Sequence, residues 1–184
     1  MIDVVLSQAC MAKLWRELRK AGSNEIGGVL AGEALGNGHF LVLDLSVQRD
    51  GSFANFSRSS TSHDRFMQHF FKRTGHNYER FNYLGEWHSH PSFPAWPSST
   101  DFLQMQGLAE DPDQQANFLA LLVVKLSRDG KIEGTAHAFR RGRPPIQAGL
   151  SASNAEALCK PVSGWRHLLK STLLWRDEPA RVSK

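Results

Sequence analysis

The chain has 184 residues, of which 41% are hydrophobic and 22% charged, so one substantial core is possible and no second domain is needed. Its formal net charge of +4 is diffuse, which disfavours nucleic acid as a partner. Two distant cysteines predict free thiols in a reducing compartment. We find no secretory leader pattern and no apolar run long enough to span a bilayer, so we expect a cytoplasmic protein without a membrane helix.

The amino-terminal part of the chain predicts a strand, a helix and a β-hairpin. Val4–Leu6 is the short strand, and Gln8–Ala21 repeats apolar residues at the spacing of an amphipathic helix that covers a core. Two apolar runs follow, Glu25–Leu35 and His39–Val47. The Gly36–Gly38 turn between them is typical of a tight hairpin.

The middle of the chain predicts a loop, a helix and a strand. Asp50–Ser62 is polar and rich in serine, so we expect a loop there, followed by a helix over Asp64–Thr74. The apolar run Phe81–Trp87 predicts a strand, and Pro91 stops its ladder because proline has no backbone N–H to donate. A further helix is expected to begin close to Asp101.

The last predicted strands, Phe118–Leu126 and Lys131–Phe139, form a second hairpin. The first of them is apolar on both faces, which favours a central position in a sheet with helices on both sides. We therefore expect an α/β fold in which helices sandwich a mixed β-sheet. We expect the ordered core to end at Arg143, giving one domain over residues 1–143, and a linker with a helical tail over residues 144–184.

The segment from Gly85 to Asp101 contains a pattern that predicts a metal site. His88 and His90 are two residues apart at the end of a predicted strand, so both imidazoles point to the same face. Asp101 lies in the first turn of the next helix and faces back toward them. These three side chains supply three ligands, and a catalytic zinc site keeps the fourth tetrahedral position for water. The pattern therefore predicts one open zinc site in a metallohydrolase.

Ser98 has two compatible interpretations. Together with Asp101 it forms the sequence of an ordinary capping box, which by itself requires no chemistry. The same hydroxyl can also point toward water in the open zinc position. The sequence therefore leaves open whether Ser98 is a helix cap alone or a cap with a catalytic task.

The activated water needs a base, because the three ligands are committed to the metal. Glu25 is the candidate, since it opens an apolar run in which Gly27 and Gly28 let other backbone approach closely. A glutamate at the start of a strand is also commonly a solvated edge residue. Glu86 is the competitor because it shares the strand parity of His88: it is either a rival base or a supporting residue behind the ligands.

Taken together, these residues resemble a known family. Glu25-x-Gly-Gly-x-Leu-x-Gly, followed by His88-x-His90-Pro91, Ser98 and Asp101, is similar to the motif of the JAMM (MPN-plus) zinc metalloproteases. The segment Gly85–Pro91 is similar to the prokaryotic JAB branch of that family. No motif position departs from the family pattern, and the resemblance covers roughly residues 3–140.

The resemblance implies a JAB/MPN-like fold and a role for each motif residue. It implies Zn2+ held by His88, His90 and Asp101, with Glu25 as the general base and Ser98 steadying the oxyanion. It also implies an isopeptidase or peptidase that removes ubiquitin or a ubiquitin-like protein from a conjugate or precursor.

The substrate stays open at this stage. Bacterial members with the Gly-Glu-Trp-His sequence are similar to deconjugating enzymes of antiphage operons, which implies a ubiquitin-like protein or its conjugate as substrate and E1-like and E2-like enzymes as possible partners. The alternative is a peptidase that processes the carboxy terminus of a sulfur-carrier or ubiquitin-like precursor. A non-catalytic scaffold domain is disfavoured, because such domains usually lack the complete ligand set.

Four further features bear on partners. The loop Asp50–Ser62 is a candidate edge for β-augmentation by an extended tail, and Trp87 and Trp96 are either channel walls or core residues. The cluster Arg140–Arg143 is either a solvated turn or a contact for an acidic partner. Gly164–Trp175 has an apolar stripe at helical spacing, which either packs on the chain's own core or docks on a partner.

Overall fold

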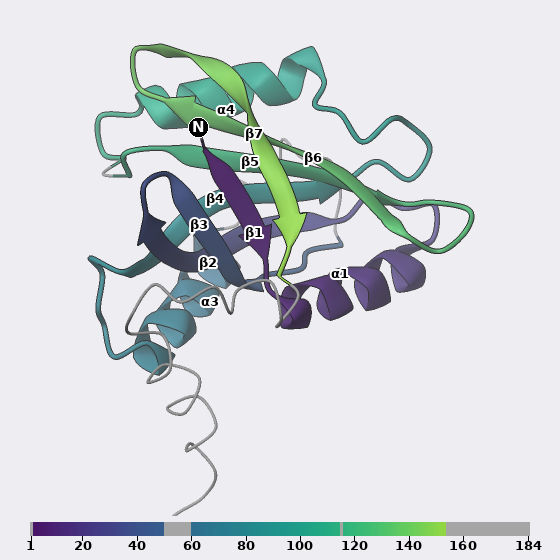
Figure 1. The fold of residues 1–184 in the computed structure, drawn as a ribbon, viewed down its shortest axis with the longest axis horizontal. Helices are drawn as coiled ribbons and strands as arrows, with labels where there is room; N and C mark the ends of the chain where they lie inside the picture. The colour runs from purple at the N-terminus through teal and green to yellow at the C-terminus, as the bar shows by residue number, and fades with distance from the viewer. Residues whose placement is uncertain (1, 50–59, 115, 154–184) are drawn as a thin grey trace, which may run out of the picture. The chain divides into compact units, whose positions relative to one another are not determined.

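A computed structural model describes residues 2–49, 60–114 and 116–153, and Met1–Ser153 forms one compact unit (Figure 1). The described elements are seven strands and three helices, which follow one another in this order: β1 (Asp3–Leu6), α1 (Gln8–Ala21), β2 (Gly27–Gly36), β3 (His39–Leu45), α3 (Ser60–Arg73), β4 (Phe81–Ser89), α4 (Ser99–Glu110), β5 (Leu119–Leu126), β6 (Ile132–Arg140) and β7 (Arg143–Ala152). The predicted tail helix and most of the predicted loop 50–62 lie outside the described residues. Within the described part, no helix combines the length and the apolar character needed to cross a membrane.

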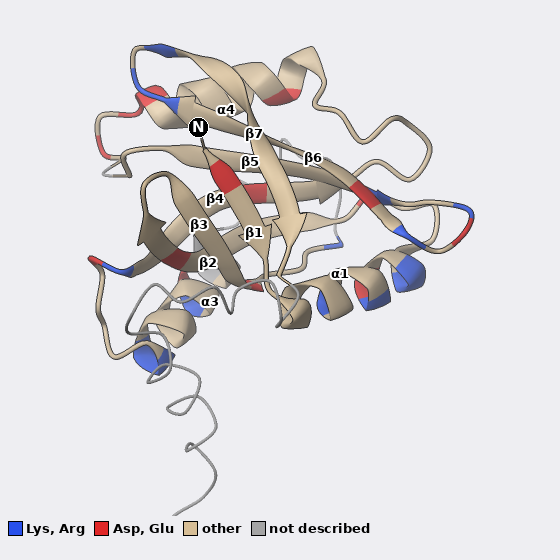
Figure 2. Ribbon diagram, in the orientation of Figure 1, with Lys and Arg blue, Asp and Glu red and all other residues tan. Residues whose placement is uncertain are grey.

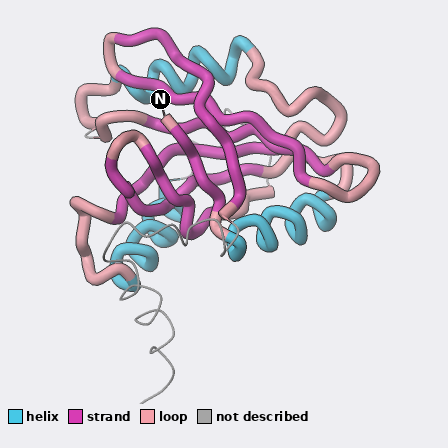
Figure 3. Tube along the Cα trace, viewed as in Figure 1, coloured by secondary structure: helices cyan, strands magenta, loops and turns pink. Residues whose placement is uncertain are grey.

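The strands form one mixed sheet that closes on itself, in the order β1-β3-β2-β4-β5-β6-β7. Closure comes from β1, which pairs in parallel with both β3 and β7. The helices lie around the outside of the strands (Figure 3). An α/β domain with a mixed sheet was expected, but the expectation of a sheet sandwiched between helices does not describe this closed arrangement.

Strand β7 is the element that the sequence analysis missed. The ordered core does not end at Arg143, because residues 143–152 pair with β6 and then with β1. Pro144 and Pro145 concealed the strand, since proline argues against ladder positions. Both lie opposite an irregularity in the β6–β7 register, where their missing N–H groups break no regular ladder. The compact unit therefore includes β7.

The two faces of β5 are both buried, as its sequence predicts, but only one of them is covered by strands and α1. Leu122 points into the barrel core beside Leu14 of α1, whereas Leu121 and Val123 pack in a second cluster with Met105 of α4. The side chains Leu119–Val124 are all buried. The central position of β5 between β4 and β6 is thus confirmed, and α4 covers the outer face.

The predicted helices are found with small differences in their limits. Helix α1 occupies the predicted residues, starts after the Ser7 cap, whose side chain accepts a bond from the Cys10 amide, and ends at Gly22 with φ of 61°. Helix α3 begins at Ser60 rather than Asp64, so the predicted loop is shorter at its carboxy end.

A bulge in β4 decides which of its side chains point outward from the barrel. Leu84 is an extra residue opposite β2, and Gly85 beside it has φ of 138°. A Cβ on Gly85 would lie 2.0 Å from a backbone oxygen of β5, so only glycine fits there. Because of the bulge, Leu84 and Trp87 both point into the barrel core. Alternation from Trp87 onward then places His88 on the outer face, under α4.

Candidate metal centre

Three side chains, from β4, the loop after it and α4, converge beside the amino end of α4. His88 lies near the end of β4, His90 follows it, and Asp101 lies in the first turn of α4. The Nε2 atoms of the two histidines are 3.0 Å apart. Oδ2 of Asp101 lies 3.5 Å from His88 Nε2 and 4.0 Å from His90 Nε2. His88 and Asp101 are buried, and His90 is open to the surface on one side.

The spacing of these three atoms fits zinc. Zinc bonds of about 2.0–2.1 Å in a tetrahedral shell place any two ligand atoms about 3.3 Å apart. The three observed separations, 3.0, 3.5 and 4.0 Å, bracket that value. Two imidazoles and a carboxylate are also the donor types of catalytic zinc sites. Among the described residues, this trio is the one cluster of potential ligands close enough to hold a metal ion.

Neighbouring groups orient the ligands. Nδ1 of His90 lies 3.0 Å from the carbonyl oxygen of Pro94, which only accepts, so Nδ1 carries the proton and Nε2 presents its lone pair to the centre. Asp101 and Ser98 form a reciprocal capping box: the Ser98 amide donates to Asp101 Oδ2 at 2.6 Å, and the Asp101 amide donates to Ser98 Oγ at 3.2 Å. The capping interpretation of Ser98 is therefore confirmed.

The Asp101 carboxyl is held in its charged form. Burial alone would raise its pKa, but the hydrogen bond and charge of His88, together with the Ser98 amide, outweigh burial and bring the pKa below its ordinary value. A carboxylate that is ionised at neutral pH is the form that binds a metal.

Glu25 is brought to the same centre by the start of β2. Gly27 pairs with His88 in the β2–β4 ladder. Next to this pair, the Ile26 amide donates to Ser89 Oγ at 3.0 Å, and the Ser89 amide donates to the Ile26 carbonyl at 2.8 Å. Glu25, directly before Ile26, lines a pocket of about 570 Å³ that also contains all three potential ligands and Ser98.

Comparison with known proteins agrees with this geometry. Residues 7–140 match the family described as prokaryotic homologs of the JAB domain. The chain belongs to this family. The resemblance to the prokaryotic JAB branch is thus confirmed, and the match extends from the start of α1 to the end of β6.

Three curated relatives carry informative names. A CD-NTase/cGAS isopeptidase of Enterobacter hormaechei is 28% identical over 148 residues, which are 78% of this chain and 79% of the relative. A protein of the same name from Vibrio cholerae is 38% identical over 81 residues, covering 42% of this chain and 49% of the relative. COP9 signalosome complex subunit 5 of Candida glabrata is 28% identical over 126 residues, 66% of this chain but 26% of the relative.

A solved structure supports the fold. The solution structure of protein DSY2949 from Desulfitobacterium hafniense superposes with a TM-score of 0.54 at 21% identity, covering 82% of this chain and 93% of that one. At this identity, the likeness concerns the fold alone.

Glu86, the competing base, lies on the same face of the JAB sheet but does not line the pocket of the metal centre. Burial raises its pKa to about 7, and a hydrogen bond with Tyr83 opposes that increase. Glu86 is therefore buried away from this pocket, whereas Glu25 lines it.

The two tryptophans near the motif have different places in the JAB domain. Trp87 is fully buried in the barrel core, and its indole N–H donates to the Ser46 carbonyl at 2.8 Å, so the channel-wall interpretation of Trp87 is wrong. Trp96 is 47% exposed and lines the pocket, next to Phe93 and Pro94. One side of the pocket is therefore apolar.

Two residues of β6 anchor the loop that forms this apolar side of the JAB pocket. The sequence analysis did not identify either of them. The Thr135 hydroxyl donates to the Ala95 carbonyl at 2.7 Å. The Trp96 ring packs edge-on against the buried ring of His137, with centroids 4.7 Å apart. Because β6 is distant in sequence from the loop that it anchors, no local signal could have found either contact.

Proposed function

We propose that this protein is a zinc-dependent isopeptidase that removes a ubiquitin-like modifier from target proteins. The observation that carries the proposal is the convergence of three potential zinc ligands with Glu25 in one open pocket. The names of the Enterobacter and Vibrio relatives support isopeptide hydrolysis as the reaction. Water adds across the isopeptide bond: the modifier gains a carboxylate, and the target lysine regains its amine.

Each motif residue has a separate task in this reaction. His88, His90 and Asp101 would hold zinc, which when bound supplies a Lewis acid that activates water and stabilises negative charge on the scissile carbonyl oxygen. Glu25 lies outside the ligand set, so its carboxylate accepts the proton of the attacking water and delivers it to the leaving amine.

The Ser98 hydroxyl assists the same step. Its oxygen already accepts the Asp101 amide, so its own proton is available for another acceptor. We propose that the hydroxyl donates a hydrogen bond to the oxyanion that develops on the scissile carbonyl.

The pocket also bears on the substrate. Its apolar side, formed by Phe93, Pro94 and Trp96, shares the pocket with the potential ligands, and we expect it to contact an extended peptide tail. The cleaved bond follows the carboxy-terminal residue of a modifier, and such a tail reaches the ligands as an extended chain. A bacterial antiphage conjugation system in the cytoplasm, with E1-like and E2-like enzymes, would supply such a substrate.

The test compares two bonds to the same modifier. The ubiquitin-like protein encoded nearest to this gene is joined to a reporter either through a lysine side chain or as a linear fusion, and mass spectrometry identifies the products of the zinc-loaded enzyme. Cleavage of the lysine-linked conjugate supports the proposal, with Glu25→Gln as the inactive control. Cleavage of the linear fusion alone would indicate precursor processing, and stability of both would overturn the proposed activity.

A further inference from the structure

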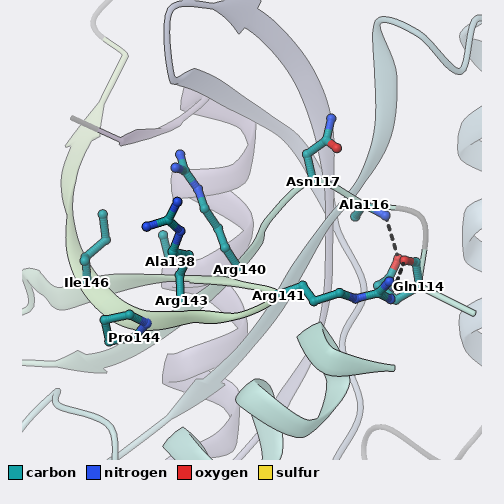
Figure 4. A pocket seen from close by; sticks show the side chains of 9 residues that line it. All are labelled: Gln114, Ala116, Asn117, Ala138, Arg140, Arg141, Arg143, Pro144 and Ile146. Atoms are coloured by element: carbon teal, nitrogen blue, oxygen red, sulfur yellow. Dashed lines mark hydrogen bonds between the residues drawn. The ribbon is translucent and has the colours of Figure 1, made fainter. Parts of the chain in front are cut away.

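A second pocket lies at the opposite end of α4 from the metal centre (Figure 4). Its volume is about 670 Å³, and the hairpin between β6 and β7 forms one side of it. Helix α4 has 12 residues, which corresponds to about 18 Å between its two ends. Asp101 marks the end at the metal centre, and Glu110, whose carboxylate accepts the Gly142 amide at 2.8 Å, marks the other end.

Two arginines of this hairpin lie close to each other although their like charges repel. Arg140 and Arg143 are cross-strand partners on β6 and β7, a position in which like charges destabilise a sheet. In Figure 4 both side chains extend from the hairpin into the pocket. Neither group has an acceptor or a counter-ion among the residues that the structure describes. A bound anion would relieve the repulsion and accept their hydrogen bonds.

The third arginine of the hairpin has a different task. The Arg141 guanidinium turns away from the other two toward Gln114 (Figure 4). It donates to the backbone carbonyls of Gln114 and Asp111. These bonds fix the loop after α4 as the opposite wall of the pocket. Arg140 and Arg143 are therefore the two cations left for a ligand.

The rest of the lining indicates the class of ligand. Ala138 and Ile146 provide an apolar floor, with Ile146 46% exposed, and the Asn117 carboxamide can donate to and accept from a peptide main chain. Acidic residues border the arginines: Figure 2 shows them at the end of α4 and in the loop that follows, beside the basic hairpin. These carboxylates would repel a long polyanion such as nucleic acid, whereas a short acidic peptide avoids them.

We propose that this pocket binds a short acidic segment of the protein conjugate that the metal centre cleaves. The inference rests on the proposed function for the origin of the segment, but binding itself needs neither zinc nor turnover. It assigns the arginine cluster of the sequence to an acidic partner rather than to a solvated turn. Carboxylates of the segment pair with Arg140 and Arg143, while apolar side chains cover Ile146.

Fluorescence anisotropy with a defined probe tests this proposal. The probe is a labelled peptide of alternating Glu and Leu residues, and its counterpart has Gln in place of Glu. The Glu peptide should bind the wild-type protein more tightly than the Gln peptide does, and Arg140→Gln/Arg143→Gln should weaken its binding about tenfold or more. The control Arg65→Gln/Arg128→Gln removes the same charge from exposed sites elsewhere and should leave the dissociation constant nearly unchanged.

Three outcomes would overturn the inference. These are equal weakening in both double variants, unchanged binding in the pocket variant, and tighter binding of a labelled single-stranded DNA than of the Glu peptide. The melting temperature of the pocket variant should not fall, because the substitution removes a repulsion, so loss of binding cannot be ascribed to unfolding. Failure of the proposed hydrolysis is distinguishable, since it leaves peptide binding intact and abolishes conjugate cleavage.

Discussion

Replacing Ser98 by alanine and by glycine separates the two tasks of this residue. Both substitutions remove the hydroxyl that accepts the Asp101 amide at 3.2 Å, but they leave the backbone bond from Ser98 to Asp101 Oδ2 in place. Alanine is a poor helix cap and costs about 1 kcal/mol of stability, whereas glycine is a tolerated cap and costs only a few tenths, about 0.3 kcal/mol.

The loss of catalytic rate should not differ between the two variants in the way that their stabilities do. If the hydroxyl donates to the oxyanion, each substitution removes the same donor and raises the barrier by about 3 kcal/mol, which lowers kcat roughly 100-fold to 1,000-fold. Stability should differ instead: the alanine variant should melt about 2–4 °C below the wild type, and the glycine variant should stay within about 1 °C of it.

The assays are conjugate cleavage at saturating substrate, metal content and thermal melting on the same preparations. Both variants should retain zinc, because the three ligands are untouched. Ser98→Thr keeps a hydroxyl and should restore part of the rate. If the glycine variant turns over at the wild-type rate while the alanine variant is slow, activity depends on the helix cap, and the assignment of Ser98 to the oxyanion is refuted.

Three further predictions concern the metal, the base and the loss of folding stability at low pH. The purified protein should take up about one zinc per chain, and Asp101→Ala should lose it; full cleavage by chelator-treated protein would exclude the zinc mechanism. Glu25→Gln should keep its zinc and lose turnover about 100-fold to 10,000-fold, and a wild-type rate would transfer the role of base to Glu86 or another group. Burial of Asp44 is outweighed by hydrogen bonds from Lys13 and Arg73, so its pKa is lowered and its stabilisation is present above its ordinary pKa and lost as the pH falls through the folded-state pKa. Asp44→Asn should therefore reduce the free energy of unfolding at pH 7 by about 1 kcal/mol, and a difference that persists at about pH 2 would contradict this account.

The parts of the site that the sequence predicts are those determined by local geometry. The parity of His88 and His90 and the capping position of Asp101 depend on spacings of two or three residues, which a strand and a helix translate directly into space. The same parity argument could have assigned Trp87 to the core, because it lies between two residues that face outward.

The parts that the sequence does not reveal depend on distant partners. Closure of the barrel needs β1 to pair with residues near the end of β7, and two prolines conceal the start of that strand. The alternation of apolar residues after them, from Ile146 to Ala152, is a period-two signal that favours a strand. The contact of Thr135 with Ala95 has no such signal, because it depends on the pairing of β4 with β5 and of β5 with β6, which brings β6 close to the loop after β4.

The reciprocal hydrogen bonds between Ile26 and Ser89 have a consequence for how such an enzyme can change its specificity. They fasten the main chain next to Glu25 to the end of β4 beside His88, so the separation of the proposed base from the proposed metal site is set by strand pairing and the Ser89 side chain rather than by a loop. The opposite side of the pocket is a loop anchored by side chains, chiefly Thr135 and the ring contact of Trp96. Substitutions on that side can reshape the opening for a different tail while the proton-transfer geometry stays as it was.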